Sequence, residues 1–200
     1  MKLFPLCLTL ALCLAAASAQ AQPRTARSLG ASGQLAVGVD RLFGFNYTTG
    51  EGRDGTTTLG LLGGTGCSAV VSPYSIPRLG FDYFVFDGFS LGIAGQLAIT
   101  SHDDDSTTII GFQPRLGYAI AVTPGFSIWP RGGLNYITVN GERDNDAHYM
   151  LALNAELMMV ASPAPHFGFT FGPTADVGIA ATHDSKTSQY GLQAGIIGWF

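Results

Sequence analysis

Charged side chains, cysteines and long apolar runs are all scarce in this 200-residue sequence. Charged residues make up only 12% of it, which is low for a soluble domain. Two of its three cysteines, Cys7 and Cys13, lie near the start of the chain. If that start is removed, Cys67 is left as a single cysteine, which cannot form an internal disulfide. After residue 21 no apolar run reaches the length of a transmembrane helix.

The first 21 residues have the pattern of an export leader. Lys2 is followed by an apolar stretch over residues 3–17, and small residues at 17–19 and 19–21 offer cleavage sites. We therefore expect residues 1–21 to be a cleaved signal peptide and residues 22–32 to be a short periplasmic segment. The remaining chain holds 9 basic and 14 acidic side chains, so nucleic acid is not an expected partner.

From residue 33 onward, apolar residues alternate with small or polar ones, which is the period of a β-strand. Turn residues such as Asp87 and Gly88 separate eight such stretches. Short turns alternate with longer polar connections at 48–74, 101–107, 140–147 and 181–187. The predicted strands cover residues 33–47, 75–86, 89–100, 108–120, 126–139, 148–160, 167–180 and 190–200.

The last stretch places Tyr190, Leu192, Ala194, Ile196 and the terminal Phe200 on one uncharged face. Such a face suits a strand whose outer side meets lipid, and an even number of strands with alternating loop lengths is typical of outer-membrane barrels. We therefore predict an all-β fold over residues 33–200, an eight-stranded antiparallel up-and-down transmembrane β-barrel. A soluble β-sandwich is the alternative, because its strands alternate too.

Aromatic residues gather at both predicted ends of the strands. Two such groups are typical of the belts that mark membrane interfaces, and a soluble sandwich gives no reason for them. One predicted belt comprises Tyr47, Tyr136, Tyr149 and Tyr190. The other, at the periplasmic end, comprises Phe86, Phe89, Phe126, Phe167 and Phe200.

If the apolar faces point outward, seven charged side chains point into the barrel. They must pair, because an unpaired buried charge is strongly destabilising. Counting from the turns places Arg131 opposite both Glu156 and Arg115, so we expect these three to form a cluster joined by Asp82 or Asp176. Arg41 falls on the apolar face and breaks the pattern. The predicted lumen charges are Asp40, Arg78, Asp82, Arg115, Arg131, Glu156 and Asp176.

This network has two interpretations. A permanent plug is favoured, because eight strands leave little free bore, and a charged constriction for ions is the rival. Three prolines, Pro77, Pro114 and Pro130, lie within predicted strands, and we expect each at a bulge or a strand end because proline removes a ladder donor. Residues 56–63 are expected to continue the first hairpin beyond the membrane rather than to add a ninth crossing.

No residues are spaced as a defensible active site. The His-Asp-Ser run at 183–185 consists of chain neighbours, which cannot form a triad in that order. The acidic run at 102–105 lacks the spacing of a calcium loop, and no lysine follows the glycine-rich stretch at 60–66 as a phosphate loop requires. We therefore expect no catalytic, cofactor or metal site and no enzymatic activity.

The organisation from residue 35 to Phe200 resembles the small OmpA-like and OmpX-like outer-membrane β-barrel superfamily, and residues 77–86, 129–136 and 195–200 are similar to segments of uncharacterised Gram-negative barrels. The resemblance implies a monomer in the outer membrane with both termini in the periplasm. It implies contacts with outer-membrane lipid and lipopolysaccharide, and recognition of the C-terminal strand by the barrel-assembly machinery. It is specific for architecture and weak for activity. We expect a structural or surface-interaction role through the loops; the rivals are a narrow passive pore and a lipid A-modifying enzyme.

Overall fold

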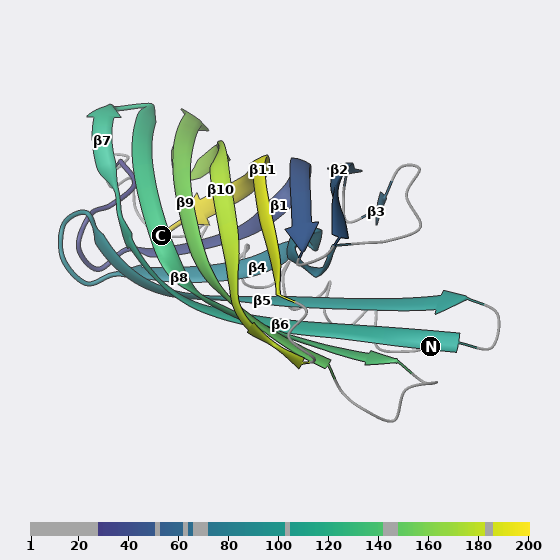
Figure 1. Ribbon diagram of the computed structural model, residues 1–200. Coiled ribbons are helices and arrows are strands. Elements are labelled where there is room, and N and C mark those ends of the chain that lie inside the picture. Colours follow the sequence, from purple (N-terminus) through teal and green to yellow (C-terminus); the bar gives the residue numbers. More distant parts are fainter. Residues whose placement is uncertain are drawn as a thin grey trace, which may run out of the picture.

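A computed structural model describes residues 28–50, 53–61, 64–65, 72–102, 105–141, 148–182 and 186–200. In this part of the chain the strands form one antiparallel sheet in the order β11-β10-β9-β8-β6-β5-β4-β1, and β11 also pairs with β1. The sheet therefore closes on itself as an eight-stranded barrel (Figure 1), which confirms the predicted fold. No helix among the described residues is long and apolar enough to cross a membrane.

The eight wall strands overlap the eight predicted ones. A further short strand, β7 (Ile120–Thr123), follows β6 after a break at Ala119 and pairs with β8. The wall strands are β1 (Leu35–Gly50), β4 (Arg78–Phe84), β5 (Phe89–His102), β6 (Asp105–Tyr118), β8 (Phe126–Gly141), β9 (His148–Ala164), β10 (Phe167–Ala181) and β11 (Thr187–Trp199).

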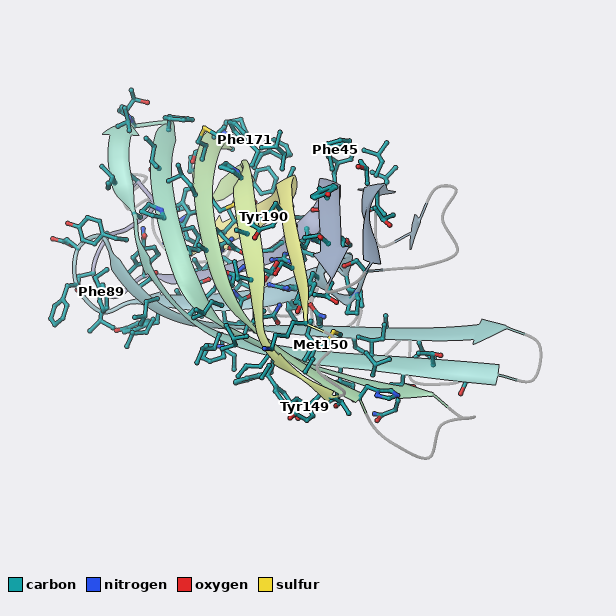
Figure 2. The ribbon with its side chains drawn as sticks, viewed as in Figure 1. Phe45, Phe89, Tyr149, Met150, Phe171 and Tyr190 are labelled. Carbon is teal, nitrogen blue, oxygen red and sulfur yellow. The ribbon has the colours of Figure 1, made fainter. Side chains whose placement is uncertain are left out.

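The wall is apolar outside and polar inside, the reverse of a soluble domain. Leu134, Leu153 and Phe169 are 44%, 52% and 49% exposed, whereas Arg115 and Glu156 are buried. Figure 2 shows Phe45 and Phe171 pointing away from the barrel. Because successive side chains of a strand point to opposite faces, the period of two in the sequence produces this sorting directly.

A bulge divides β1 into two parts. Residues 35–40 pair with β4, whereas residues 43–50 pair with β2 (Arg53–Leu61), which continues the first hairpin and is followed by β3 (Gly64–Thr65). The described part of the strand predicted at 56–63 therefore belongs to β2, which adds no ninth wall strand. At the bulge the register with β11 shifts between Val39 and Phe43, and Arg41 has a φ of 64°.

One side of the barrel rises above the rest at the loop end. Strand β4 begins only at Arg78, so residues 96–102 of β5 pair with β6 alone among the described residues. Figure 1 shows β5 and β6 projecting as a long hairpin. A short 3-10 helix, η2 (Pro73–Ser75), precedes β4.

The three prolines lie where pairing is interrupted. Pro77 immediately precedes β4, as predicted. Pro114 of β6 falls in a gap in the ladder with β8, between the pairs Phe112–Tyr136 and Arg115–Gly133. Pro130 of β8 lies opposite the break between β6 and β7. The prediction of a bulge or strand end is therefore wrong for Pro114 and Pro130, which lie inside β6 and β8. Each lies where the ladder on one side is interrupted and is paired on its other side, with β5 or β9, so the missing donor falls on the interrupted side.

Several sequence predictions concern parts of the chain outside the described residues. These are the signal peptide, most of the segment at 22–32, Cys67 and the run at 183–185, together with the middle of the acidic run at 102–105.

Candidate functional site

The barrel encloses the seven predicted lumen charges and one more, Arg41. Each of the eight residues is at most 5% exposed. Four are arginines and four are carboxylates, so the network among the described residues has no net charge. We define the lumen network as Asp40, Arg41, Arg78, Asp82, Arg115, Arg131, Glu156 and Asp176.

The first half of the network is built on Asp40, which bridges two arginines. Its carboxylate accepts from Arg115 Nη1 at 2.6 Å and from Arg131 Nη2 at 3.0 Å. Arg115 also donates two hydrogen bonds to the Asp82 carboxylate, from Nε to Oδ1 at 3.0 Å and from Nη2 to Oδ2 at 2.5 Å. Arg131 Nη2 lies 2.6 Å from Glu156 Oε2. Two-point arginine–carboxylate contacts fix geometry as well as charge.

Register explains which charges face each other. Arg131 lies directly opposite Glu156, as predicted. The prediction that Arg115 lies opposite Arg131 is wrong, because Arg115 lies opposite Gly133 and Arg131 opposite Gly117. The turn between β7 and β8 is centred one residue later than assumed, at Pro124 and Gly125, which moves the facing partner by two positions. The two arginines are thus diagonal neighbours, and each faces a glycine.

The second half of the network is built on Asp176. Arg41 Nη2 donates to its Oδ2 at 2.7 Å, and Arg78 Nη2 lies 3.8 Å from its Oδ1. The Oδ1 atom also accepts from Asn135 at 3.2 Å and from Asn154 at 3.0 Å. Arg41 reaches Glu156 at 3.5 Å, which links the two halves. Of the two carboxylates that the sequence had offered as partners for Arg115 and Arg131, Asp82 contacts Arg115, whereas Asp176 contacts neither arginine.

Arg78 connects the charged network by hydrogen bonds to neutral side chains nearer the loop end. Its Nε donates to Gln96 at 2.8 Å and its Nη1 donates to Gln113 at 2.5 Å. Gln113 in turn donates to Asn154 at 2.6 Å. Every guanidinium of the network therefore has a carboxylate or amide oxygen beside it, as burial of a charge requires.

The expectation that Arg41 lies on the apolar face is wrong, because the bulge turns two successive residues, Asp40 and Arg41, into the lumen. A strict period of two cannot anticipate this reversal. One signal was present in the sequence: three predicted lumen arginines faced four carboxylates. That imbalance required a fourth cation, and Arg41 is the arginine closest in sequence to the predicted set.

Glycines on the inner face make room for the network. A Cβ at Gly80 would clash with the Arg115 guanidinium, and one at Gly92 would clash with the Asp82 carboxylate. A Cβ at Gly117 would lie 2.5 Å from Trp129 Nε1 and 2.7 Å from Ser90 Oγ. Side chains of an eight-stranded barrel fill its interior, so large ones need small ones opposite.

An apolar layer closes the lumen at the turn end. Residues 28–32 fold beneath the barrel, and Leu29 is buried against Phe84, Trp129 and Trp199. The Gly30 and Ala31 amides donate to Gln34 Oε1 at 2.9 and 3.1 Å. The Arg131 guanidinium lies over the Trp129 ring, 4.7 Å from its centroid, so this layer contacts the network directly.

A second segment closes the loop end. We call residues 72–76, which include η2, the strap. Tyr74 of the strap is fully buried and packs with Ile76, Ile109 and Ile137. The Tyr74 hydroxyl donates to the Thr187 carbonyl at 3.2 Å, and Arg41 donates to the Tyr74 carbonyl. Ser72 and Ser75 both donate to Gln189, at 2.7 and 3.1 Å.

Burial within the strap raises the pKa of the Tyr74 phenol to about 12, and the nearby Asp176 carboxylate adds to the rise. Neither Leu29 nor Tyr74 could be assigned to the barrel interior from the sequence, because each lies in a segment without strand periodicity. Both contacts depend on residues far along the chain.

The nine predicted belt residues lie on the outer surface or at its edges. The four tyrosines are 44–46% exposed, and Phe86, Phe167 and Phe200 are 67%, 38% and 55% exposed, whereas Phe89 and Phe126 are half-buried. The Tyr136 and Tyr149 rings stack at 6.5 Å. Phe89 lies at the turn end of the barrel (Figure 2).

The chemistry open to this lumen is limited. Within the described ranges, no three His, Cys, Asp or Glu side chains are grouped as a metal site would need. Opposite charges meet at hydrogen-bonding distance across the bore, and apolar layers lie on both sides of them. The arrangement suits a sealed, rigid interior.

Two comparisons find no match, since neither a protein-family model nor a curated protein sequence corresponds to this chain. Among solved structures, Neisserial surface protein A (NspA) is similar with a TM-score of 0.55 and 11% identity, over 84% of this chain and 99% of that one. Ail, the attachment invasion locus protein of Yersinia pestis, in complex with the heparin analogue sucrose octasulfate, is similar with a TM-score of 0.50 and 10% identity, over 83% and 99%. At these identities the likeness concerns architecture, and the chain has the fold of the small eight-stranded outer-membrane β-barrels.

Proposed function

We propose that this chain is an integral outer-membrane protein of Gram-negative bacteria with a closed lumen, and that it acts through its loop-end surface. The observation that carries the proposal is the neutral lumen network, sealed by Leu29 at one end and by Tyr74 of the strap at the other. An apolar outer wall with aromatic residues near both ends supports placement in a membrane.

In this proposal the short turns and both termini lie in the periplasm, and the long connections face outside. The outer wall contacts outer-membrane lipid and lipopolysaccharide, and the chain is a monomer. Strand β11 would be read by the barrel-assembly machinery, since it closes the barrel. Phe200 supports this role, because its backbone exchanges two hydrogen bonds with Leu35, at 3.1 and 3.0 Å.

The projecting β5–β6 hairpin is the part of the loop end best suited to contact another molecule. Leu97 and Ile99 are 63% and 68% exposed on it, and residues 96–102 have a strand edge that pairs with no other described residue. Unpaired edges with apolar side chains are surfaces to which an extended chain can add. The longer connections at 48–74, 101–107, 140–147 and 181–187 hold nine acidic and three basic side chains. A sulfated polyanion, such as the ligand in the Ail complex, is therefore an unfavourable partner here.

Two measurements test the barrel and its closure. Migration on a denaturing gel should change on boiling, because a membrane barrel stays folded in detergent until heated. In planar bilayers the protein should give no conductance steps. Regular steps that disappear in Arg131→Ala would contradict a sealed lumen and support the pore.

The surface role is tested on cells that display the protein. Wild-type display should raise autoaggregation or adhesion to host cells, and the double variant Leu97→Thr, Ile99→Thr should lower it while migrating as a folded barrel. The matched control is Leu153→Thr, on the wall away from the hairpin. Equal adhesion by displaying and non-displaying cells would remove this role.

A further inference from the structure

A groove of about 630 Å³ lies in the outer wall where β4 begins. Its lining includes Val39, Pro77, Leu79, Gly95, Leu97 and Phe112. Leu79 and Phe112 are 49% and 48% exposed, so these walls are accessible from outside the barrel. The volume falls within the range of about 300–1,000 Å³ that is usual for ligand sites.

Three features of the sequence meet at this point. Pro77 ends the pairing of β4 with its neighbours, and the bulge in β1 just after Val39 transfers that strand from β4 to β2. Gly95 stands at an outward position of β5, opposite both Leu79 and Phe112. A Cβ built on Gly95 meets nothing closer than the Gly111 carbonyl oxygen, 4.0 Å away. The gap in the apolar surface therefore results from a missing side chain.

The strand pairing fixes the depth of the groove relative to a bilayer. Up to Gly95, β5 is paired on both sides, whereas beyond it one edge is unpaired among the described residues. Unpaired backbone groups are not tolerated in the hydrocarbon core, because no water is present to satisfy them. The boundary between hydrocarbon and headgroups must therefore fall close to Gly95. The groove spans that boundary: Leu79 and Phe112 line its hydrocarbon side, whereas Pro77 and Leu97 line its loop side, next to the free edge at the level of the headgroups.

We infer that this groove holds an acyl chain of a membrane lipid from the loop-end leaflet, with the headgroup beside the free edge of β5. The inference rests on the proposed membrane location. The lining is continuous with the lipid-facing wall, so hydrocarbon is the occupant that meets the groove first. Inside the wall, Gln96 donates to the Pro73 carbonyl at 2.8 Å and accepts from Arg78 at 2.8 Å, so this side chain needs no polar ligand.

Gly95→Leu tests the site, because the open space around Gly95 accepts a side chain that would fill the groove. The matched control is Ala155→Leu, which adds the same side chain at an exposed outward position on β9. Each protein is reconstituted in vesicles of phosphatidylethanolamine and phosphatidylglycerol, extracted in mild detergent and measured by native mass spectrometry. Wild type and Ala155→Leu should retain a lipid, and Gly95→Leu should lose it.

Spin-labelled phosphatidylglycerol in the same vesicles gives a second reading, since the motionally restricted fraction should fall in Gly95→Leu alone. If Gly95→Leu does not fold, Phe112→Ala removes one wall instead and should also lose the lipid. Equal retention by wild type and the groove variants, or no retained lipid in wild type, would overturn the inference. Heat-dependent migration separates the two proposals: a barrel that inserts and migrates normally without retaining lipid refutes only the groove.

Discussion

Removing Arg41 should destabilise the barrel more than removing any exposed charge. In Arg41→Met the apolar stem is kept, but Asp176 loses its contact at 2.7 Å and Glu156 loses one at 3.5 Å. Breaking a buried ion pair by removing one partner costs about 3–5 kcal/mol, because the remaining charge is left uncompensated. The lost hydrogen bond to the Tyr74 carbonyl adds about 1 kcal/mol.

A double-mutant cycle separates charge pairing from packing. Asp176→Asn alone removes the carboxylate that Arg41 and Arg78 share and leaves four arginines against three carboxylates, whereas Arg41→Met with Asp176→Asn leaves three of each. The double variant should therefore be more stable than the sum of the single effects predicts, by about 0.5–3 kcal/mol. Lys186→Met, at an exposed position, is the control and should change little.

The assay is urea unfolding of the reconstituted barrel followed by tryptophan fluorescence. Trp129 and Trp199 are 0% and 2% exposed in the lumen, so their emission reports on its opening. Wild-type stability in Arg41→Met would refute the claim that Arg41 completes the network. Additivity within about 0.5 kcal/mol in the cycle would show that Arg41 and Asp176 act independently.

Three further predictions follow from the same contacts. Gly92→Ala should lower stability by about 1–3 kcal/mol in urea unfolding, because its methyl group would displace the Asp82 carboxylate, whereas Gly60→Ala, with open space around it, should be better tolerated. Tyr74 should ionise late in an alkaline absorbance titration, and because its pKa is raised to about 12, the stability contributed by the strap should decline as pH rises above the unfolded value near 10; Tyr74→Phe should remove that decline. Deleting Phe200 removes both backbone hydrogen bonds to Leu35 and should reduce the yield of heat-modifiable protein in cells, whereas Phe86→Ala, at an exposed turn, should not.

The wall strands were predictable from the sequence because their signals are local. Alternation fixes which face each residue takes, and residues such as Asp87 and Gly88 mark the turns. Register was predictable only where the turn centre was right: it succeeded for Arg131 and Glu156 and failed for Arg115. An error of one residue in a turn centre moves the facing partner by two positions, so turn geometry limits such reasoning.

The parts that sequence reasoning missed depend on irregular backbone or on distant contacts. Arg41 points into the lumen because its backbone has a positive φ, and the sequence does not signal this conformation because the residue is not a glycine. Leu29 and Tyr74 seal the two ends from segments without periodicity, and their positions follow from the walls around them. Charge balance within the lumen is the general rule that could have identified Arg41, because it requires counting partners rather than reading a pattern.

Because the charges of the lumen network are spread over most of the wall strands, the network restricts the register in which these strands can pair. Six of the eight wall strands contribute at least one of its charges, with β1 and β4 contributing two each. A slip of one residue in any of these strands would turn its charged side chain toward lipid, where an arginine near the middle of the bilayer costs about 2–4 kcal/mol. The same slip would leave a buried partner unpaired. A slipped register is therefore penalised by both costs, the charge exposed to lipid and the partner left unpaired in the lumen. An apolar lumen of equal stability would lack these two penalties, so the charged network selects one register of the closed barrel.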